Sequence, residues 1–243
     1  MSWSHNSYPS ESNVMGFSET AQSGVAILLL LQFIDGLSST QKKYDLAAWK
    51  AFVHTYFTDY AMMRLSFVSP QVKYSANYTA QNANIEYTSR VFELSTLVFP
   101  IFLWTNHENG VAQMQFVLGA IKEQTTVAHG YVVACPQAKL IYWYSNGSQV
   151  VAEGHLCVQF TPAILKMEWF EFITLKSDEY ILRDMARSNL PSSLVNDLGI
   201  TRKVLRCLEM GESLTDMYAL MVASQVNRLG PLKTLSHFVS LLE

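Results

Sequence analysis

His54 has the residue type and the neighbours that acid–base catalysis requires. An imidazole titrates near neutral pH, and a carboxylate such as Asp59 or Glu93 would orient it for proton transfer. His54 also lies on the polar side of a predicted amphipathic helix, where a histidine is usually an ordinary surface residue. The sequence therefore favours a surface residue over a catalytic base.

Glu168 and Glu171 are a second candidate, because paired carboxylates perform acid–base chemistry when one is buried and its pKa is raised. In a regular strand, residues an odd number apart point to opposite faces, which argues against a pair. Cys157 lies on an apolar predicted strand and is interpreted as a core thiol, not a nucleophile. We predict no catalytic residue.

The sequence contains no recognisable metal or cofactor motif. Cys135, Cys157 and Cys207 form no CxxC pair, and the six histidines are not spaced as zinc ligands. Glycine-rich phosphate loops and calcium-binding patterns are absent as well. We therefore predict neither a metal nor a cofactor.

Composition argues against two further functions. The net charge is −3 and the basic residues are scattered, so no positive patch would neutralise nucleic-acid phosphates. The apolar run 25–34 is too short for a membrane helix, which takes ~20 residues. Apolar residues make up 49% of the chain and charged residues only 15%, which indicates a large core or a surface covered by another chain. We predict neither direct nucleic-acid binding nor a membrane span.

Two helices are predicted to precede the sheet, over residues 24–39 and 45–57. Asp45 is a suitable N-cap for the second. The residues that give this helix an aromatic face at helical spacing are Trp49, Phe52, Val53 and Tyr56. Apolar and polar residues alternate directly after this helix, which indicates a strand. We therefore expect the helix to pack on a sheet through its aromatic face.

A meander of strands follows, with turn residues between the strands. The predicted strands cover residues 62–68, 85–94, 112–118, 128–135, 139–144, 150–160 and 164–175. Pro136-Gln137 and residues 145–148 mark the clearest hairpins, whereas 95–104 fits either a short helix or a bulged strand.

The last strand is apolar on both faces. Phe170 and Phe172 are predicted on one face, and the other face carries Met167, Trp169, Ile173 and Leu175. An antiparallel strand of this kind needs two covers. One cover is the helix pair, and a second copy of the chain is the expected other.

Helical spacing returns after residue 177. Helices are predicted over residues 201–208, 212–226 and 231–242. Gly211 and Gly230 separate them, and Thr201 is a suitable cap for the first. The polar segment 1–23 is interpreted as a flexible arm.

Several of these segments resemble the LIM-domain-binding (Chip, SEUSS-like) family of transcriptional adaptors. The longest match is LAAWKAFVHTYFTDYAMMRLSF at residues 46–67, which is similar to the start of that family's dimerisation domain. Shorter matches follow in the family's order at residues 108–111, 152–156, 159–161, 166–172, 198–201 and 205–209. Together they extend over residues 27–239.

The resemblance implies an α+β fold, in which an NTF2-like curved antiparallel sheet is packed by N-terminal helices and followed by a C-terminal helical segment. It implies a dimerisation domain at 24–187 and a partner-binding helical segment at 188–243. Members of this family homodimerise, bind single-stranded-DNA-binding-protein-like partners that carry a LUFS/LisH domain, and bridge DNA-bound transcription factors in the nucleus. The resemblance therefore predicts a scaffold that is not an enzyme.

Aromatic and apolar residues are the candidates for both contacts. The predicted dimer anchors on the outer face of the sheet are Tyr142, Phe160, Trp169, Phe170 and Phe172. The predicted partner-binding residues are Gly199, Ile200, Thr201, Val204, Leu205, Leu208, Leu214 and Met217. Packing within the chain's own core is an alternative for each of them. The alternative function is an NTF2-like small-molecule-binding protein, or an isomerase- or dehydratase-type enzyme with acid–base residues inside the cone.

Overall fold

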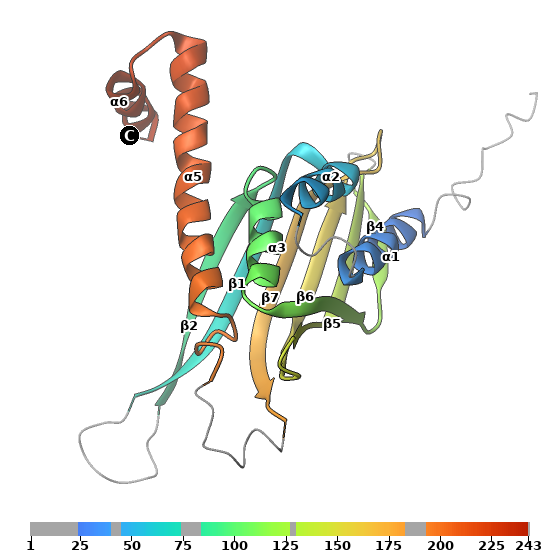
Figure 1. Cartoon of the computed structure of the whole chain (residues 1–243). Coiled ribbons are helices and arrows are strands. Elements are labelled where there is room, and N and C mark those ends of the chain that lie inside the picture. The colour runs from blue at the N-terminus through green and yellow to red at the C-terminus, as the bar shows by residue number, and fades with distance from the viewer. Residues whose placement is uncertain (1–23, 40–44, 74–83, 127–129, 183–192, 243) are drawn as a thin grey trace, which may run out of the picture.

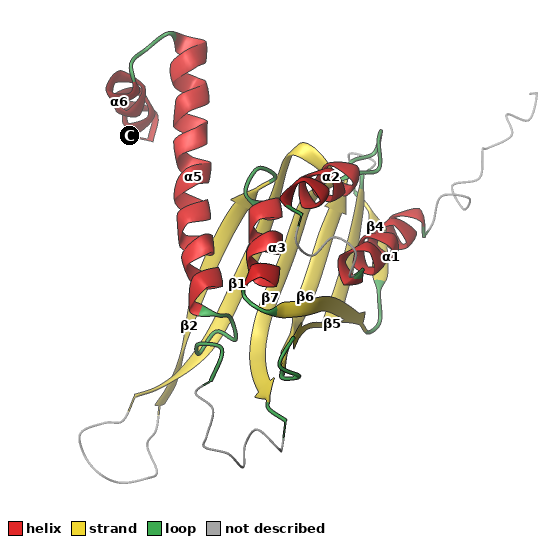
Figure 2. Cartoon of the chain, viewed as in Figure 1, coloured by secondary structure: helices red, strands yellow, loops and turns green. Residues whose placement is uncertain are grey.

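The structure is a computed structural model that describes residues 24–39, 45–73, 84–126, 130–182 and 193–242. The predicted arm at 1–23 and the predicted domain boundary at 187/188 lie outside the described residues. Within the described part, one curved seven-stranded sheet carries three helices on its inner face, and two further helices follow at its edge (Figure 1, Figure 2). The predicted α+β, NTF2-like fold is confirmed.

The strands are β1 Phe57–Lys73, β2 Asn84–Ser95, β3 Val111–Leu118, β4 Lys122–Thr125, β5 Tyr131–Tyr144, β6 Gln149–Phe160 and β7 Met167–Tyr180. The helices are α1 Val25–Ser38, α2 Leu46–Tyr56, α3 Phe99–Glu108, α5 Arg202–Asn227 and α6 Pro231–Leu242. The sheet order is β2-β1-β7-β6-β5-β3, and β4 also pairs with β5. Helices α1, α2 and α3 lie on one face of this sheet, which we call the inner face (Figure 1).

The parallel pair at the centre of the sheet joins β1 to β7. In this contact Met63 pairs with Phe170 and Leu65 pairs with Phe172. The other described strand pairs are antiparallel. The sequence indicated a meander of neighbouring hairpins and contained no sign that its first strand pairs with its last.

Aromatic side chains fill the space between the helices and the sheet, as predicted. Trp49 and Phe52 of α2 are buried, and Phe33 of α1 stacks on Phe52 with ring centroids 5.4 Å apart. Phe33 also meets Phe57 and Phe170 of the sheet edge-on, at 5.6 and 5.8 Å. Because such ring pairs stabilise beyond the area they bury, this cluster anchors both helices to the sheet.

Local signals placed the starts of the helices correctly. The Asp45 carboxylate accepts a hydrogen bond from the Ala47 amide at 2.8 Å, and the Thr201 hydroxyl accepts one from the Val204 amide at 3.3 Å. Pro100 stands in the first turn of α3, where its missing N–H is tolerated. Of the two interpretations of 95–104, the helix is therefore correct.

The hairpin predicted at residues 145–148 is confirmed, since it joins β5 to β6. The hairpin predicted at Pro136-Gln137 is wrong. β5 runs through this dipeptide as a bulge between Cys135 and Ala138, and β4 and β3 pair with β5 on either side of it. A bulge accepts proline because the residue there need not donate a ladder hydrogen bond.

The break predicted at Gly211 is also wrong, because α5 is one helix of 26 residues. A Cβ at Gly211 would lie 2.7 Å from Val98 Cγ1 and 2.9 Å from Leu94 Cδ2. The absent side chain therefore serves close packing of α5 against β2 and the start of α3, and does not end a helix.

Glu123 of β4 caps the N-terminus of α1. Its carboxylate accepts hydrogen bonds from the amides of Gly24 at 2.8 Å and Ile27 at 3.2 Å. We expect Glu123→Ala to lower the free energy of unfolding by about 1 kcal/mol, because two amides lose their acceptor and the helix dipole loses an anion. Urea unfolding measures this, with the exposed neighbour Lys122→Ala as the control. Equal stability of both variants would show that the cap does not contribute.

Candidate protein-interaction site

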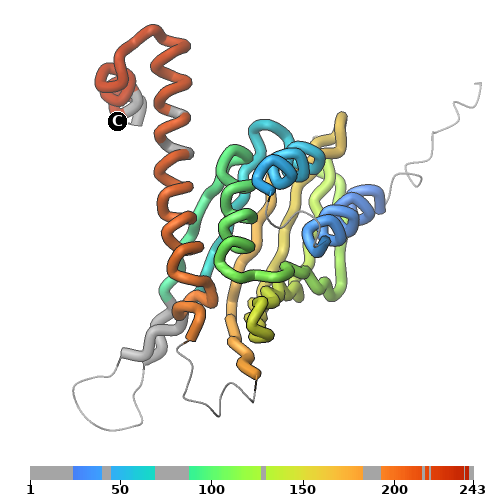
Figure 3. The backbone as a smooth tube through the Cα atoms, in the orientation of Figure 1, coloured from blue at the N-terminus to red at the C-terminus, as the bar shows by residue number. Residues whose placement is uncertain are grey.

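Helices α5 and α6 form a hairpin of which only the beginning is buried. The first half of α5 packs on α3 and β2, and Val204, Cys207 and Leu208 are buried there. The second half extends past the sheet, and α6 folds back beside it (Figure 3). The projecting part of this hairpin is thus the least covered helical surface in the described chain.

The projecting part presents a row of apolar side chains to solvent. On α5 these are Leu214, Met217, Tyr218, Met221, Val222 and Val226, and on α6 they are Leu232, Leu235 and Val239. We call these nine residues the hairpin patch. On α5 they recur at helical spacing on one side, and flexible methionines adapt well to a partner's surface. An apolar patch of this size on a helix pair is typical of a protein-interaction site.

Only two of the predicted partner-binding residues belong to the hairpin patch. Leu214 and Met217 are exposed, whereas Ile200, Val204 and Leu208 are buried in the chain's own core. For these three the core interpretation is correct, because α5 needs an apolar face to attach it to β2 and α3.

The other three predicted partner-binding residues have local structural roles. Gly199 adopts a positive φ of 76°, and a Cβ there would lie 1.8 Å from the Ser177 hydroxyl oxygen. Thr201 caps α5, and Leu205 is partly buried against the core. Tyr218 and the α6 residues were not among the predicted partner-binding residues, although their helical spacing continues the pattern of Leu214 and Met217.

Four of the five predicted dimer anchors are core residues. Tyr142, Phe160, Phe170 and Phe172 are buried on the inner face, under the helices, so they cannot line the outer face of the sheet. Trp169 alone lies on the outer face, partly exposed. The predicted outer face of the last strand is therefore corrected to Trp169, Glu171 and Ile173.

A bulge explains why Met167 was predicted on the wrong face of β7, whereas the predicted separation of Phe170 and Phe172 from Trp169 and Ile173 agrees with the structure. Phe160 pairs with Met167 and Gln159 pairs with Trp169, so Glu168 is an extra residue in β7. Met167 is consequently buried on the inner face although it is two residues before Trp169. Glu168 and Glu171 then share the outer side, contrary to the prediction, where Glu168 contacts Gln159 and Glu171 contacts Arg64. They do not form a catalytic pair.

Across the rest of the outer face, charged and apolar residues alternate in rows. Arg64 lies between Glu93 and Glu171, at 3.7 and 3.5 Å. Lys139 forms a 2.6 Å ion pair with Glu153. Beyond this ion pair, at the far end of the face, lie Ile141, Trp143, Val151 and Tyr180, which we call the Trp143 patch. In this patch Trp143 and Tyr180 are exposed, and Ile141 and Val151 are half-buried.

The interior between helices and sheet is filled. The cavity that remains there has a volume of about 30 Å³, and its lining is Phe33, Leu37, Met63, Leu65, Phe99, Phe102, Leu103, Met114, Phe116, Leu140, Tyr142 and Phe170. Tyr142 supplies the one polar group of this lining. Such a space holds about one water molecule and no substrate. It offers no carboxylate or imidazole for acid–base chemistry.

Tyr142 and Tyr144 should lower the stability of the domain at high pH. Burial raises the pKa of both phenols, that of Tyr144 to about 12, and the charge of Glu179 adds to the effect at Tyr144. Folding therefore favours the neutral phenols: their contribution is complete below pH ~10 and is lost as the pH rises through the folded-state values.

We expect the free energy of unfolding to fall above pH 10, by up to about 1.4 kcal/mol per pH unit for each tyrosine. Urea unfolding between pH 9 and 12 measures this slope. The double variant Tyr142→Phe/Tyr144→Phe should reduce it, whereas the exposed-residue variant Tyr180→Phe should not. An unchanged slope in the double variant would contradict the prediction. The half-buried thiol of Cys157 and the buried thiol of Cys207, whose pKa values burial also raises, remain in every variant.

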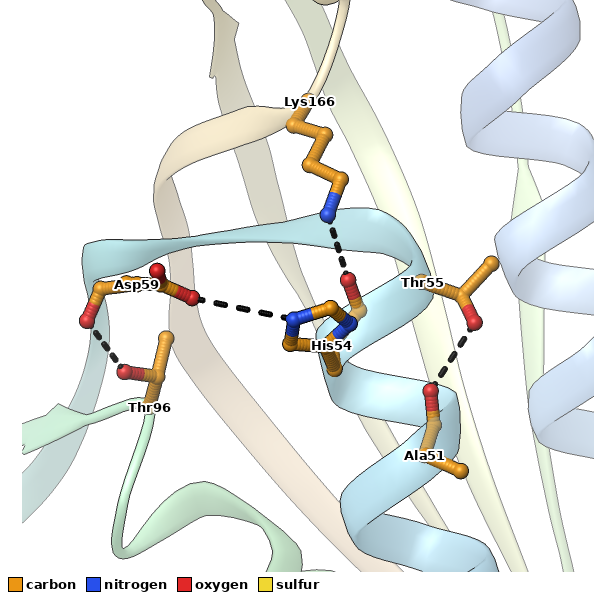
Figure 4. A network of polar contacts seen from close by, with 6 residues as sticks. All are labelled: Ala51, His54, Thr55, Asp59, Thr96 and Lys166. Atoms are coloured by element: carbon orange, nitrogen blue, oxygen red, sulfur yellow. Dashed lines mark hydrogen bonds and ion pairs between the residues drawn. The ribbon is translucent and has the colours of Figure 1, made fainter.

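His54 belongs to an exposed polar network (Figure 4). His54 and Asp59 line an open groove of about 600 Å³, which Tyr218 of α5 also lines. Its Nε2 lies 4.0 Å from the Asp59 carboxylate, and both side chains are more than 70% exposed (75% and 78%). Lys166 donates a 2.6 Å hydrogen bond to the His54 carbonyl, and Thr96 donates one of 2.7 Å to the Asp59 carbonyl. Glu93, the other proposed partner, instead faces Arg64. The network fastens the end of α2 to the loops around it.

Neither a metal cluster nor a membrane helix is found among the described residues. No group of three His, Cys, Asp or Glu side chains there is arranged to hold a metal ion. No helix of the described ranges is both long and apolar enough to cross a membrane.

An α+β domain with little interior space and an exposed apolar helix pair is typical of a protein-interaction module. A family model described as LIM-domain binding protein matches residues 28–189 and 184–236. The chain belongs to this family, as the resemblance of its motifs predicted.

Two fungal proteins are similar to nearly the whole chain. Adhesion defective protein 1 of Schizosaccharomyces pombe is 27% identical over 97% of this chain and 66% of its own length. Transcriptional activator ptaB of Aspergillus fumigatus is 25% identical over 90% of this chain and 33% of its own length. The chain thus spans just under two thirds of the first relative and one third of the second.

Solved structures show only a distant likeness. Kfla4162 from Kribbella flavida has a TM-score of 0.44 at 6% identity, over 66% of this chain and 95% of that one. A variant of Rv3472, a function unknown protein from Mycobacterium tuberculosis, also has a TM-score of 0.44 at 6% identity, over 81% and 94%. Likenesses at this identity concern the fold alone.

Proposed function

We propose that this chain is a non-enzymatic transcriptional co-regulator scaffold that homodimerises and binds a helical partner. Membership of the LIM-domain binding family and the similarity to a transcriptional activator support a role in transcription. Two observations argue against the alternative of a small-molecule-binding protein or an isomerase- or dehydratase-type enzyme. The cavity between the inner-face helices and the sheet is only about 30 Å³, and His54 and Asp59 of the open groove are exposed to solvent, not buried. The exposed hairpin patch is the observation that carries the proposal.

The hairpin patch is the proposed partner-binding surface. Two helices with apolar residues on their exposed sides offer a groove into which a partner lays an amphipathic helix. A single-stranded-DNA-binding-protein-like partner with a LUFS/LisH domain is the expected occupant, and DNA-bound transcription factors are contacted through the assembly. The proposed location is the nucleus.

The Trp143 patch is the proposed centre of the homodimer contact. Tyr142, Phe160, Phe170 and Phe172 are no longer candidates for dimer anchors because they are buried. Trp169 lies on the same outer face, but about 33 Å from the Trp143 patch along the strands. Trp143 is 39% exposed and Tyr180 51%, and aromatic residues at the centre of a patch carry much of the energy of such contacts. The ion pair Lys139–Glu153 lies at its rim, where charges set orientation more than affinity.

Size-exclusion chromatography with light scattering, alone and with a LUFS-domain protein, tests both parts. The unaltered chain should elute as a dimer and bind the LUFS-domain protein. Trp143→Asp should give a monomer that still binds, and Met217→Asp/Met221→Asp should give a dimer that does not. The control variant Glu212→Ala/Gln225→Ala changes two polar, exposed residues of the same helix. It should remain a dimer and still bind the LUFS-domain protein. A monomeric unaltered chain, or binding by the double methionine variant, would refute the corresponding part.

A further inference from the structure

A hollow on the outer face lies at the opposite end from the Trp143 patch. It has a volume of about 480 Å³ and is lined by Thr58, Tyr60, Gln159, Thr161, Glu168 and Trp169. Ten residues of β6, from Gln149 to Gln159, separate it from the Trp143 patch, which corresponds to about 33 Å. A dimer centred on the Trp143 patch would therefore leave this hollow accessible.

Two irregularities of the sheet bring its aromatic residues to the surface. Between Phe57 and Met62 the β1 chain advances five residues while β7 advances two, from Met167 to Trp169. The extra residues of β1 carry Tyr60 outward, so that its side chain is 94% exposed. Trp169 is turned to the same face by the bulge at Glu168. Tyr60 and Trp169 both line the hollow, and no other aromatic ring of the described chain stacks on either of them.

Glu168 gives the hollow a negative charge that the described residues do not neutralise. Its carboxylate accepts a hydrogen bond from the Gln159 side-chain amide, and no described Lys, Arg or His lies within ion-pair distance of it. Its neighbour Glu171, in contrast, faces Arg64 at 3.5 Å. A partly buried carboxylate that lines the same hollow as two aromatic rings is complementary to a cation.

We propose that this hollow binds an arginine side chain of a partner protein. A guanidinium is planar, stacks on indole and phenol faces, and donates several hydrogen bonds in one plane. The free oxygen of the Glu168 carboxylate and the side-chain carbonyl of Gln159 would accept those hydrogen bonds, with Trp169 and Tyr60 against the faces of the cation. Methylated lysine, which needs a closed aromatic cage, fits an open two-ring hollow less well. The site is separate from the hairpin patch and goes beyond the scaffold function.

Titration of the full chain with blocked amino acids tests the proposal, with the Trp169 indole N–H followed by NMR and assigned from Trp169→Phe. Nα-acetyl-arginine amide should shift this signal saturably. The citrulline analogue, which has the same shape without the charge, should bind at least about tenfold more weakly. Free arginine should also bind more weakly than the blocked form, because its carboxylate meets Glu168.

Two variants keep the test independent of folding. Tyr60→Ala alters an exposed side chain, and Glu168→Gln keeps the shape and removes the charge, so both should remain folded and weaken arginine binding by about tenfold. Leu175→Ala, an exposed apolar residue farther along β7, should bind as the unaltered chain does. Equal binding of citrulline, stronger binding of trimethyl-lysine, undiminished binding by Glu168→Gln, or no shift at millimolar ligand would each overturn the proposal.

Discussion

Leu208→Asp should unfold the domain, whereas Met217→Asp should leave it folded. The two residues lie on the same helix, but Leu208 is 0% exposed and Met217 is 57% exposed. A carboxylate at Leu208 would be buried without a partner and would replace apolar contacts, which together should cost about 4 kcal/mol or more. At Met217 the same charge would stay in water and change stability by about 0.5 kcal/mol or less.

Urea unfolding followed by circular dichroism distinguishes these outcomes, and Leu208→Met, which roughly conserves volume, is the matched control. If Leu208→Asp unfolded at the same urea concentration as the unaltered chain, the first half of α5 would not be anchored to the sheet. If Leu208→Asp unfolds the domain as expected, a loss of partner binding by this variant reports on folding and not on the contact. This is why Met217 and Met221 are the informative positions for the partner test.

Gly154→Ala should destabilise the protein by about 3 kcal/mol or more, which is large for the addition of one methyl group. A Cβ on Gly154 would lie 1.8 Å from the backbone oxygen of Ile173 on the neighbouring strand. A backbone atom cannot rotate away as a side chain can, so the β6–β7 register would have to open at its shift between Glu153 and Gly154.

The matched control for this change is Gly230→Ala, since a Cβ there meets nothing within 4 Å. Thermal unfolding of both variants gives the comparison. Similar melting temperatures for Gly154→Ala and the unaltered chain would show that the two strands can separate at little cost, contrary to the expectation.

Features that depend on residues close together in the sequence were predicted correctly. Asp45 and Thr201 predicted the starts of their helices correctly. The side chain of each accepts a hydrogen bond from a backbone amide two or three residues later, so the cap is a local feature of the sequence. The spacing of Trp49 and Phe52 was sufficient to predict the joint between α2 and the sheet. The same helical spacing placed Leu214 and Met217 on one side of a helix, where both are exposed, and their role in partner binding stays a prediction.

The errors arise from non-local pairing. One extra residue at Glu168 reverses the face of Met167, and nothing around Glu168 in the sequence marks it. Val204 and Leu208 repeat with the same helical spacing as Leu214 and Met217, so the sequence could not separate residues that face β2 from residues that face solvent. Only the position at which α5 leaves the sheet makes that distinction.

The parallel contact between β1 and β7 has a consequence for synthesis of the chain on the ribosome. The strands are sheet neighbours, yet Phe57 pairs with Met167, so most of the domain must be translated before the first hairpin gains its second neighbour. Until then one long edge of β1 has no backbone partner, and such an edge is prone to pair with other chains. We therefore expect the nascent chain to be most prone to aggregation during this interval.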